Sequence, residues 1–251
     1  MVFRDTLNII NKLTVIRLFN LFKLYMSFIV SRISKKGAIH GLPAALSIEP
    51  TTTCNLGCPE CPSGLRQFTR KTGNLKSELN TKIINEISTS LLYINYYFQG
   101  EPFINRNLFE LIREASKKNI YTSTSTNAHY LTPKNAVKTV ESGLDRLIIS
   151  VDGTTQETYE AYRKGGSLSK VIQGTKNLIN AKRDLKSKTP HIIFQFLVVR
   201  QNEHQIESAI KLSKNLSVDE IRFKTAQLYD YKNGNPLMPT IEKYSRYKKS
   251  K

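Results

Sequence analysis

Cysteine is scarce in this 251-residue sequence, which holds only three. An odd number of cysteines cannot form a disulfide framework, and a structural zinc site or an electron-carrying iron–sulfur cluster requires four ligands. A disulfide-stapled secreted domain is therefore excluded. Because unpaired cysteines persist in reducing compartments, we expect the protein in the cytoplasm.

Long apolar runs are missing as well. The uninterrupted hydrophobic stretches are far shorter than a bilayer requires, so the sequence predicts no membrane-spanning helix. The basic character of the N-terminus is weak and no small-residue cleavage site follows it, which argues against a signal peptide.

Acidic residues are few, since 20 Asp and Glu oppose 38 Lys and Arg and leave a net charge of +18. This excess indicates either docking to anionic partners (an acidic electron donor, an acidic peptide, anionic lipid or nucleic acid) or a solvated lysine-rich surface. No arginine–aromatic platform or recognition motif supports nucleic acid. With 39% hydrophobic and 23% charged residues, the chain is globular rather than disordered or fibrous.

The three cysteines, Cys54, Cys58 and Cys61, lie within eight residues and have the spacing C-x3-C-x2-C. Three thiols on one tight loop indicate a metal centre with one coordination position left open, which is what a catalytic metal needs. Two alternatives stay open: a zinc site completed by a histidine, and three unrelated cysteines. The nearest histidine, His40, lies on the wrong side of the preceding strand, which disfavours the zinc site.

This spacing after a short strand resembles the radical S-adenosylmethionine superfamily. The resemblance implies that the three cysteines hold a [4Fe-4S] cluster whose fourth iron binds the amino and carboxylate groups of S-adenosylmethionine. It also implies an enzyme with an acidic electron donor such as flavodoxin or ferredoxin. The donated electron would cleave S-adenosylmethionine to methionine and a 5′-deoxyadenosyl radical, which abstracts a hydrogen atom from a substrate.

Strand-like and helix-like segments alternate from residue 44 onward. The expected strands are residues 45–49, 92–98, 120–125, 146–151, 192–199 and 220–226. The expected helices are residues 77–91, 108–117, 133–142, 156–182 (one or two helices) and 204–214. This order predicts an α/β fold with right-handed parallel crossovers, either a curved barrel or a doubly wound sheet.

The position of the cysteines favours the barrel, because barrel active sites form at the carboxyl ends of the strands. The resemblance runs from Leu46 to Ala226 and implies a partial (β/α)6 TIM-like barrel, open along one side. We expect three parts: an N-terminal amphipathic helical segment (1–40), the core domain (41–230) and a C-terminal tail (231–251).

The N-terminal segment carries a narrow polar stripe on an otherwise apolar helix. The stripe consists of residues spaced three or four apart: Arg17, Asn20, Lys23, Ser27 and Ser31. Two interpretations stay open. The helix either packs against the barrel or a missing domain, or lies in a membrane interface at the inner face of the membrane, with Lys35 and Lys36 near anionic head groups.

The second and third strands end in groups suited to S-adenosylmethionine. Gln99-Gly100-Glu101-Pro102 resembles the Gly-Gly-Glu motif of the superfamily. Glu101 is expected to accept hydrogen bonds from the methionine ammonium, and Gly100 allows close backbone approach. Asn127 stands in a segment similar to the Thr-Asn-Gly of the family, with a polar turn before the next helix as the alternative.

The later strands supply the remaining candidates. Ser150 is implied to bind the ribose hydroxyls, whereas Asp152 either shares this site or caps the following helix. Arg163 matches an arginine that binds the methionine carboxylate in related enzymes, with a surface ion pair as the alternative. Val198 and Val199 either flank the adenine or belong to the core.

The sequence departs from the family in two places. Glu60 precedes the last cysteine, where the family has an aromatic residue against the adenine, so the adenine contacts stay open. Residues 47–51 and 244–247 resemble the branch that continues into a SPASM extension with auxiliary clusters, in which peptide modification is common. The chain reaches Lys251 before such cysteines, so we expect a truncated member or an enzyme with one cluster. A catalytically silent relative that binds a cluster or zinc as a scaffold is the alternative function.

Overall fold

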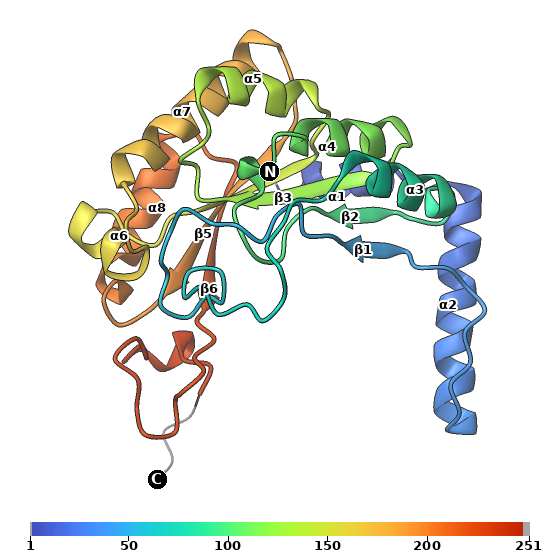
Figure 1. The fold of residues 1–251 in the computed structure, drawn as a ribbon, viewed down its shortest axis with the longest axis horizontal. Helices are drawn as coiled ribbons and strands as arrows, with labels where there is room; N and C mark the ends of the chain where they lie inside the picture. The colour runs from blue at the N-terminus through green and yellow to red at the C-terminus, as the bar shows by residue number, and fades with distance from the viewer. Residues whose placement is uncertain (1, 248–251) are drawn as a thin grey trace.

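Six parallel strands form one sheet, in the order in which they occur along the chain (Figure 1). The computed structural model describes residues 2–247. The strands are β1 (Ala45–Ser47), β2 (Tyr93–Asn95), β3 (Tyr121–Thr126), β4 (Arg146–Ser150), β5 (His191–Val198) and β6 (Glu220–Thr225). Within the described residues β1 and β6 do not pair. The sheet is therefore open along one side, and the predicted α/β fold is confirmed.

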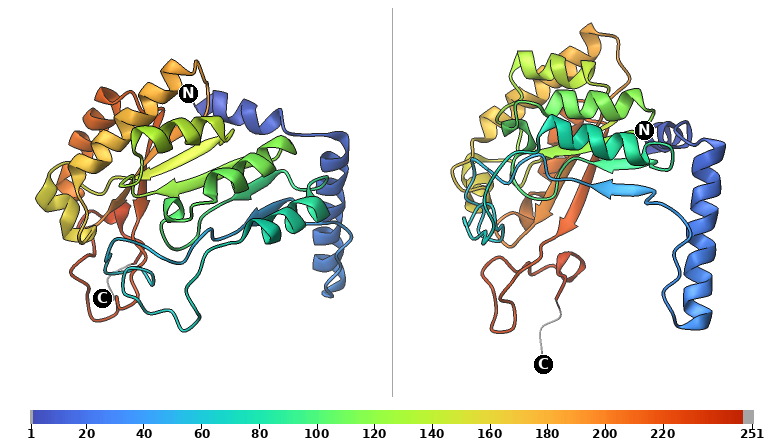
Figure 2. Two further views of the ribbon diagram at one scale, coloured as in Figure 1. Left: turned by 45° about the horizontal axis from the view of Figure 1, so that its top comes forward. Right: turned by 45° about the vertical axis from the view of Figure 1, so that its right-hand side comes forward.

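The helices that connect the strands cover one face of the sheet (Figure 2). They are α3 (Ser77–Ile87), α4 (Leu108–Lys117), α5 (Pro133–Glu141), α6 (Gln156–Tyr162), α7 (Leu168–Asp184) and α8 (Ile206–Asn215). Helix α4 shows why they pack there, because it buries Leu108, Leu111, Ile112 and Ala115 at helical spacing. These side chains join strand residues in the main hydrophobic core, which leaves the opposite face free for chemistry.

The expected elements between residues 77 and 225 are all present, and their differences from the prediction have local causes. The expected helix at 156–182 divides into α6 and α7 at Gly165, whose φ of 75° lies in the left-handed region that favours glycine. Strand β1 ends before the expected residue 49. Pro50 follows and has no N–H to extend the ladder.

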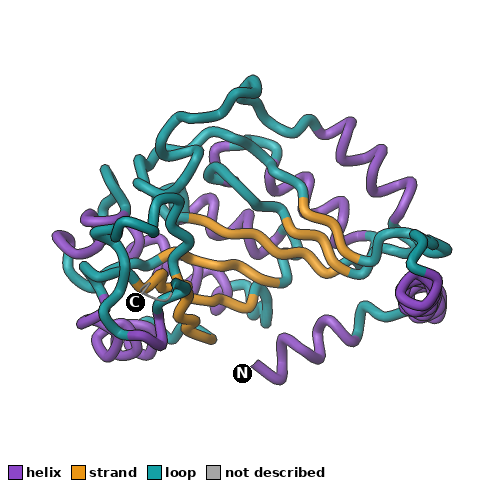
Figure 3. Tube along the Cα trace, turned by 90° about the horizontal axis from the view of Figure 1, so that it is seen from below, coloured by secondary structure: helices purple, strands orange, loops and turns teal. Residues whose placement is uncertain are grey.

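The N-terminal segment contains two helices rather than one. Helix α1 (Val2–Ile10) precedes the expected amphipathic helix α2 (Val15–Ser34), and the axes are bent by 96°. Figure 3 views α2 along its axis, beyond the amino ends of the strands. No single helix within residues 2–247 is both long and apolar enough to cross a bilayer, although the bent pair of α1 and α2 reaches the required length and hydropathy together.

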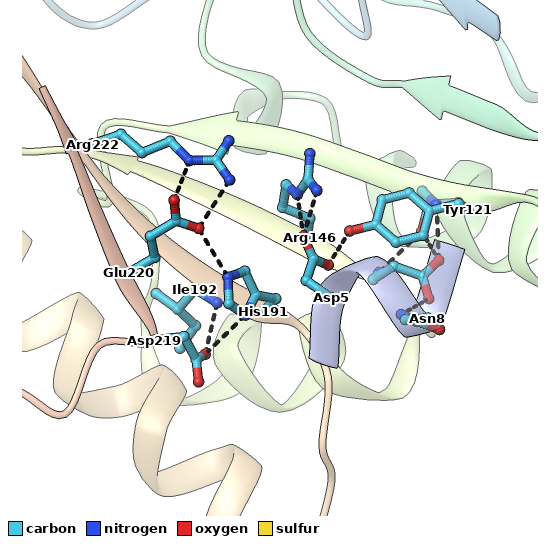
Figure 4. A network of polar contacts seen from close by, with 11 residues as sticks. Asp5, Asn8, Tyr121, Arg146, His191, Ile192, Asp219, Glu220 and Arg222 are labelled. Atoms are coloured by element: carbon cyan, nitrogen blue, oxygen red, sulfur yellow. Dashed lines mark hydrogen bonds and ion pairs between the residues drawn. The ribbon is translucent and has the colours of Figure 1, made fainter. Parts of the chain in front are cut away.

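Helix α1 lies against the amino ends of β3 and β4 (Figure 4). The Asp5 carboxylate forms an ion pair with Arg146 and accepts a hydrogen bond from the Tyr121 hydroxyl. Asn8 donates to the Asp145 carboxylate at 2.8 Å. These partners are more than a hundred residues away along the chain, so the sequence pattern alone gave no sign of α1.

Candidate functional site

The three cysteines lie on the long loop between β1 and α3 and line one cavity at the carboxyl ends of the strands. The cavity has a volume of about 190 Å³. It is also lined by most of the other predicted site residues: Gln99, Gly100, Glu101, Pro102, Asn127, Ser150 and Arg163. Asp152 does not line it. The fold therefore gathers groups from the ends of β1, β2, β3 and β4, and from the residue that follows α6.

Each thiol has a different polar neighbour. The Leu56 N–H lies 3.5 Å from Cys54 Sγ, the Cys61 thiol lies 3.4 Å from Gln99 Oε1, and an Arg163 N–H points at Cys58 Sγ from 3.8 Å. Burial raises the pKa of the Cys54 thiol to about 11. Burial also raises the pKa of Cys58, while the Arg163 guanidinium opposes that shift.

The thiols converge on one cavity but not on one point. Within residues 2–247, no three His, Cys, Asp or Glu side chains come together closely enough to hold a single metal ion. A cluster with four irons is bound differently, because each cysteine binds its own iron at a separate corner. The donor set of three free thiols with no fourth cysteine fits such a cluster with one iron left open.

Gly100 shows why the loop that follows β2 needs a glycine here. Its φ is 77°, and a Cβ atom at this position would lie 2.2 Å from the carbonyl oxygen of Thr51. The Gly100 N–H donates to Ser63 Oγ at 2.9 Å, and the Glu101 N–H donates to the Thr53 carbonyl at 2.8 Å. Residues 99–101 are thus held directly against both sides of the cysteine loop, which only a glycine allows.

Glu101 is almost completely buried, and its carboxylate accepts three hydrogen bonds inside the protein. The donors are the Phe103 N–H at 3.2 Å, the Thr126 hydroxyl at 2.7 Å and the Asn127 N–H at 2.7 Å. Burial raises the pKa of Glu101 to about 7, although these donors oppose the shift. A carboxylate has about four acceptor positions, so roughly one remains for a donor in the cavity.

Asn127 joins the end of β3 to the cysteine loop. Its side-chain amide donates to Asn55 Oδ1 at 2.8 Å, and its side-chain oxygen accepts from the His129 N–H at 3.1 Å. The segment is therefore more than the polar turn that leads to α5, whose N-cap is Thr132.

Asp152 and Arg163 form a buried ion pair instead of the helix cap and the surface pair that were the alternatives. Arg163 Nε lies 2.5 Å from Asp152 Oδ2, and Asp152 Oδ1 accepts from the Leu197 N–H at 2.6 Å. Thr155 is the residue that caps α6. Burial alone would lower the pKa of Arg163, but the Asp152 carboxylate holds it well above its usual value. Asp152 therefore positions Arg163 from behind the cavity.

The two valines at the end of β5 have different surroundings. Val198 packs with Phe196 and Ala209 on the helix side of the sheet, so it belongs to the core. Val199 packs with Leu56 and Cys58 beside the cysteine loop. Neither valine lines the cavity.

Glu60 holds residues 229–238, which follow β6 and include the start of the C-terminal tail, against the cysteine loop. Its carboxylate accepts from the Tyr229 N–H at 3.0 Å and from the Asn235 side-chain amide at 3.2 Å. Leu237 and Met238 of this segment are buried in the same cluster as Cys58. The residue that departs from the family thus has a structural partner in the tail. Of the expected tail, residues 248–251 lie outside the described residues.

Sequence reasoning missed several residues that shape the site. Arg66 donates to the Cys54 carbonyl at 2.8 Å, and Ser63 accepts from Gly100. Tyr97, Phe98 and Gln195 line the cavity. The only sequence signal for Gln195 is that it interrupts the apolar run of β5, whereas Ser63 and Arg66 stand close after the last cysteine.

Comparison with known proteins gives the family and the fold. The model of the radical SAM superfamily matches residues 48–213. A PqqA peptide cyclase of Bradyrhizobium diazoefficiens is 27% identical over 207 residues, which cover 80% of this chain and 52% of that protein. A PqqA peptide cyclase of Rhodopseudomonas palustris is also 27% identical, over 83% of this chain and 55% of that protein. The chain thus spans about half the length of these relatives.

Solved structures share the fold at lower identity. Streptococcus suis SuiB bound to S-adenosylmethionine superposes with a TM-score of 0.62 at 16% identity, over 84% of this chain and 44% of SuiB. The anSMEcpe structure with bound AdoMet and the Cp18Cys peptide gives a TM-score of 0.62 at 21% identity, over 78% of this chain and 55% of that one.

Proposed function

Because this chain belongs to the radical SAM superfamily, we propose that it is a radical enzyme that modifies a peptide. The superfamily uses a [4Fe-4S] cluster and S-adenosylmethionine, and membership assigns both cofactors to this chain. The observation that carries the proposal is the single cavity lined by all three cysteines and by groups from the ends of the next three strands.

Cys54, Cys58 and Cys61 are the proposed ligands of the cluster. They are free thiols on one loop, and thiolates are the ligands that iron–sulfur clusters require. Burial disfavours the charged thiolates in the metal-free protein, so iron would displace the thiol protons as it binds. Arg163 beside Cys58 favours the thiolate, and packing of Leu56 and the tail keeps water from this thiol.

The remaining cavity residues are proposed to bind S-adenosylmethionine. Glu101 has about one acceptor position for the methionine ammonium, Arg163 is a donor for the carboxylate, and Ser150 faces the cavity for the ribose. The same side of the cavity is completed by Gln99, Gly100, Pro102 and Asn127. Asp152 lies outside the cavity and orients Arg163 through their ion pair. When bound together, the two cofactors supply one-electron cleavage of a carbon–sulfur bond and hence hydrogen abstraction. The chain contributes binding, orientation and exclusion of water.

A peptide is the proposed substrate class because relatives at 27% identity are peptide cyclases. The side chain of Phe98 is three-quarters exposed at the rim of the cavity, and Tyr97 and Gln195 lie on its wall. Such an aromatic and amide surface suits a peptide backbone and its side chains. The net charge of +18 further supports an acidic electron donor such as flavodoxin or ferredoxin, and the free thiols support a cytoplasmic location.

Anaerobic reconstitution with iron and sulfide tests the cluster and the cosubstrate. The wild-type chain should bind about four irons and, with reductant and S-adenosylmethionine, release 5′-deoxyadenosine. Single alanine variants of Cys54, Cys58 and Cys61 should lose both properties, while Leu65→Ala in the same loop keeps them. Preferential binding of zinc, or an iron-loaded sample that forms no 5′-deoxyadenosine, would instead support the silent scaffold.

The substrate class needs a separate measurement. The reconstituted enzyme is incubated with a short peptide encoded beside its gene, deuterated at its side chains. Deuterium in 5′-deoxyadenosine and a mass change in the peptide are the expected results. If 5′-deoxyadenosine forms but the peptide neither changes mass nor donates deuterium, the proposal of a peptide substrate is wrong. The proposal of a radical enzyme would still be supported.

A further inference from the structure

Helix α2 is polar on its buried side and apolar on its exposed side. Its three buried residues are Arg17, Asn20 and Ser27. Ten of its large apolar side chains are exposed, and Phe19 and Phe22 are each more than half exposed. A helix that packs on a protein core has the opposite pattern. Within residues 2–247, the outward face of α2 therefore lacks the apolar partner that its composition requires.

The polar stripe faces inward because the returning chain uses it. The Asn20 side chain exchanges two hydrogen bonds of 2.9 Å with the backbone of Leu42. Ser27 Oγ accepts from the His40 N–H at 3.0 Å, and Ser31 Oγ accepts from the Ala38 N–H at 2.9 Å. These side chains satisfy backbone groups of an extended segment that has no strand partner. The rotation of α2 about its axis is thereby fixed, with its apolar face outward.

Arg17 fixes the first turn of α2 to the barrel. Its guanidinium donates to the carbonyls of Ser88, Lys118 and Asn119, at 2.6–3.0 Å, where α3 and α4 end. A cation at the carboxyl ends of two helices also complements their dipoles. From this anchor α2 extends past the edge of the sheet (Figures 1 and 2), so its apolar face does not contact the barrel.

The charges of residues 2–42 indicate which kind of partner covers the apolar face of α2. Residues 2–42 contain seven lysines and arginines and a single acidic residue, Asp5, which is already paired with Arg146. Lys23, Arg32 and Lys36 on or beside α2 are exposed. A second copy of the chain would bring the same positive charge to the contact, whereas an anionic lipid surface offers both apolar and negative groups.

We propose that α2 binds anionic lipid bilayers and lies in the plane of the interface. Its apolar face enters the boundary between head groups and acyl chains, and Lys35 and Lys36 meet lipid phosphates. This inference goes beyond the proposed reaction and does not depend on it. The barrel, anchored through Arg17, would then be held at the membrane surface with its cavity unblocked, because α2 stands at the amino ends of the strands and the cavity at their carboxyl ends.

Vesicle flotation of the purified full chain tests the proposal. Wild-type protein should float with vesicles of phosphatidylcholine and phosphatidylglycerol, and far less with phosphatidylcholine alone. Lys35→Gln/Lys36→Gln should weaken partitioning about twenty-five-fold, because each lysine near an anionic surface contributes about fivefold. The matched control Lys211→Gln/Lys214→Gln removes two exposed lysines from α8 and should leave partitioning unchanged.

A second pair of variants tests the apolar face. Phe22→Ser should weaken partitioning roughly tenfold or more, and Leu79→Ser, at an exposed apolar position of α3, should not. Sizing by light scattering is done on the same samples. Failure of the wild type to bind anionic vesicles overturns the proposal, as does a dimer that Phe22→Ser converts to monomer, because the face would then be occupied by protein.

Discussion

The buried ion pair behind the cavity predicts that Asp152→Asn strongly destabilises the protein. Asp152 is completely buried, and its partner Arg163 has a side chain only 17% exposed. Asparagine keeps an oxygen for the Leu197 N–H but loses the charge that compensates the guanidinium. Leaving a buried charge without its partner costs about 3–5 kcal/mol, a large part of the roughly 5–15 kcal/mol that stabilises a domain.

The matched control is an arginine–aspartate ion pair that is exposed to solvent. Arg183 and Asp184 lie 3.0 Å apart with side chains 73% and 64% exposed. Asp184→Asn should cost less than about 1 kcal/mol, because exposed ion pairs are screened by solvent. The two substitutions change the same atoms, so the difference between them isolates the effect of burial.

Urea denaturation followed by far-ultraviolet circular dichroism measures both variants, since the chain has no tryptophan for fluorescence. The expected difference in the free energy of unfolding is about 2 kcal/mol or more. If the two variants lose equal stability, Asp152 does not compensate Arg163 in the folded protein, and its assignment as a positioning residue fails.

Three further predictions concern other parts of the molecule. Arg17→Met should cost about 3 kcal/mol in urea denaturation, because it removes the hydrogen bonds of a buried guanidinium to the helix-end carbonyls of Ser88, Lys118 and Asn119, whereas Lys36→Met at an exposed site should cost less than about 0.5 kcal/mol. Burial raises the pKa of Glu101 from 4.5 to about 7, so the folded state favours the protonated carboxyl. Protonated Glu101 therefore contributes fully to the free energy of unfolding below pH 4.5, and this contribution is lost as the pH rises through about 7. Stability relative to Glu101→Gln should therefore fall by about 3 kcal/mol between pH 4 and pH 8, and a constant difference would refute the shift. Glu60→Ala should expose the tail to limited proteolysis about tenfold faster, while Glu242→Ala, in the same tail, should leave cleavage unchanged.

Sequence reasoning succeeded where the signal is local. The spacing of Cys54, Cys58 and Cys61 and the alternation of strands and helices are both readable within short windows, and the family match and the six-stranded sheet confirm the recognition and the fold. Gly100 was also identified from local sequence, and its close contact with the Thr51 carbonyl gives the reason. Roles of the individual cavity residues toward cluster and cosubstrate stay predictions.

Sequence reasoning failed where a side chain is defined by a distant partner. Asp152 was equally compatible with a helix cap because nothing near it indicates Arg163 or the Leu197 N–H. Glu60 looked only like a lost aromatic residue, since its partners Tyr229 and Asn235 lie about 170 residues further along. Tertiary hydrogen bonds of this kind have no periodicity, so no pattern of residue types predicts them.

The amino and carboxyl ends of the strands differ in how their charged side chains are paired. At the amino ends, Asp5 forms an ion pair with Arg146 and Asn8 donates a hydrogen bond to Asp145, so these charged groups already have partners from helix α1. At the carboxyl ends, Glu101 and Arg163 line the cavity and can each form further hydrogen bonds. Arg163 points a second N–H at Cys58 in addition to its ion pair with Asp152, and Glu101 can accept about one more hydrogen bond. A site that binds a charged cosubstrate needs donors and acceptors that are still free to form hydrogen bonds, whereas the amino ends of the strands, which serve only the structure, do not. The proposed membrane-binding helix is anchored at the amino ends of the strands, where substitutions can alter lipid binding without changing any residue that lines the cysteine cavity.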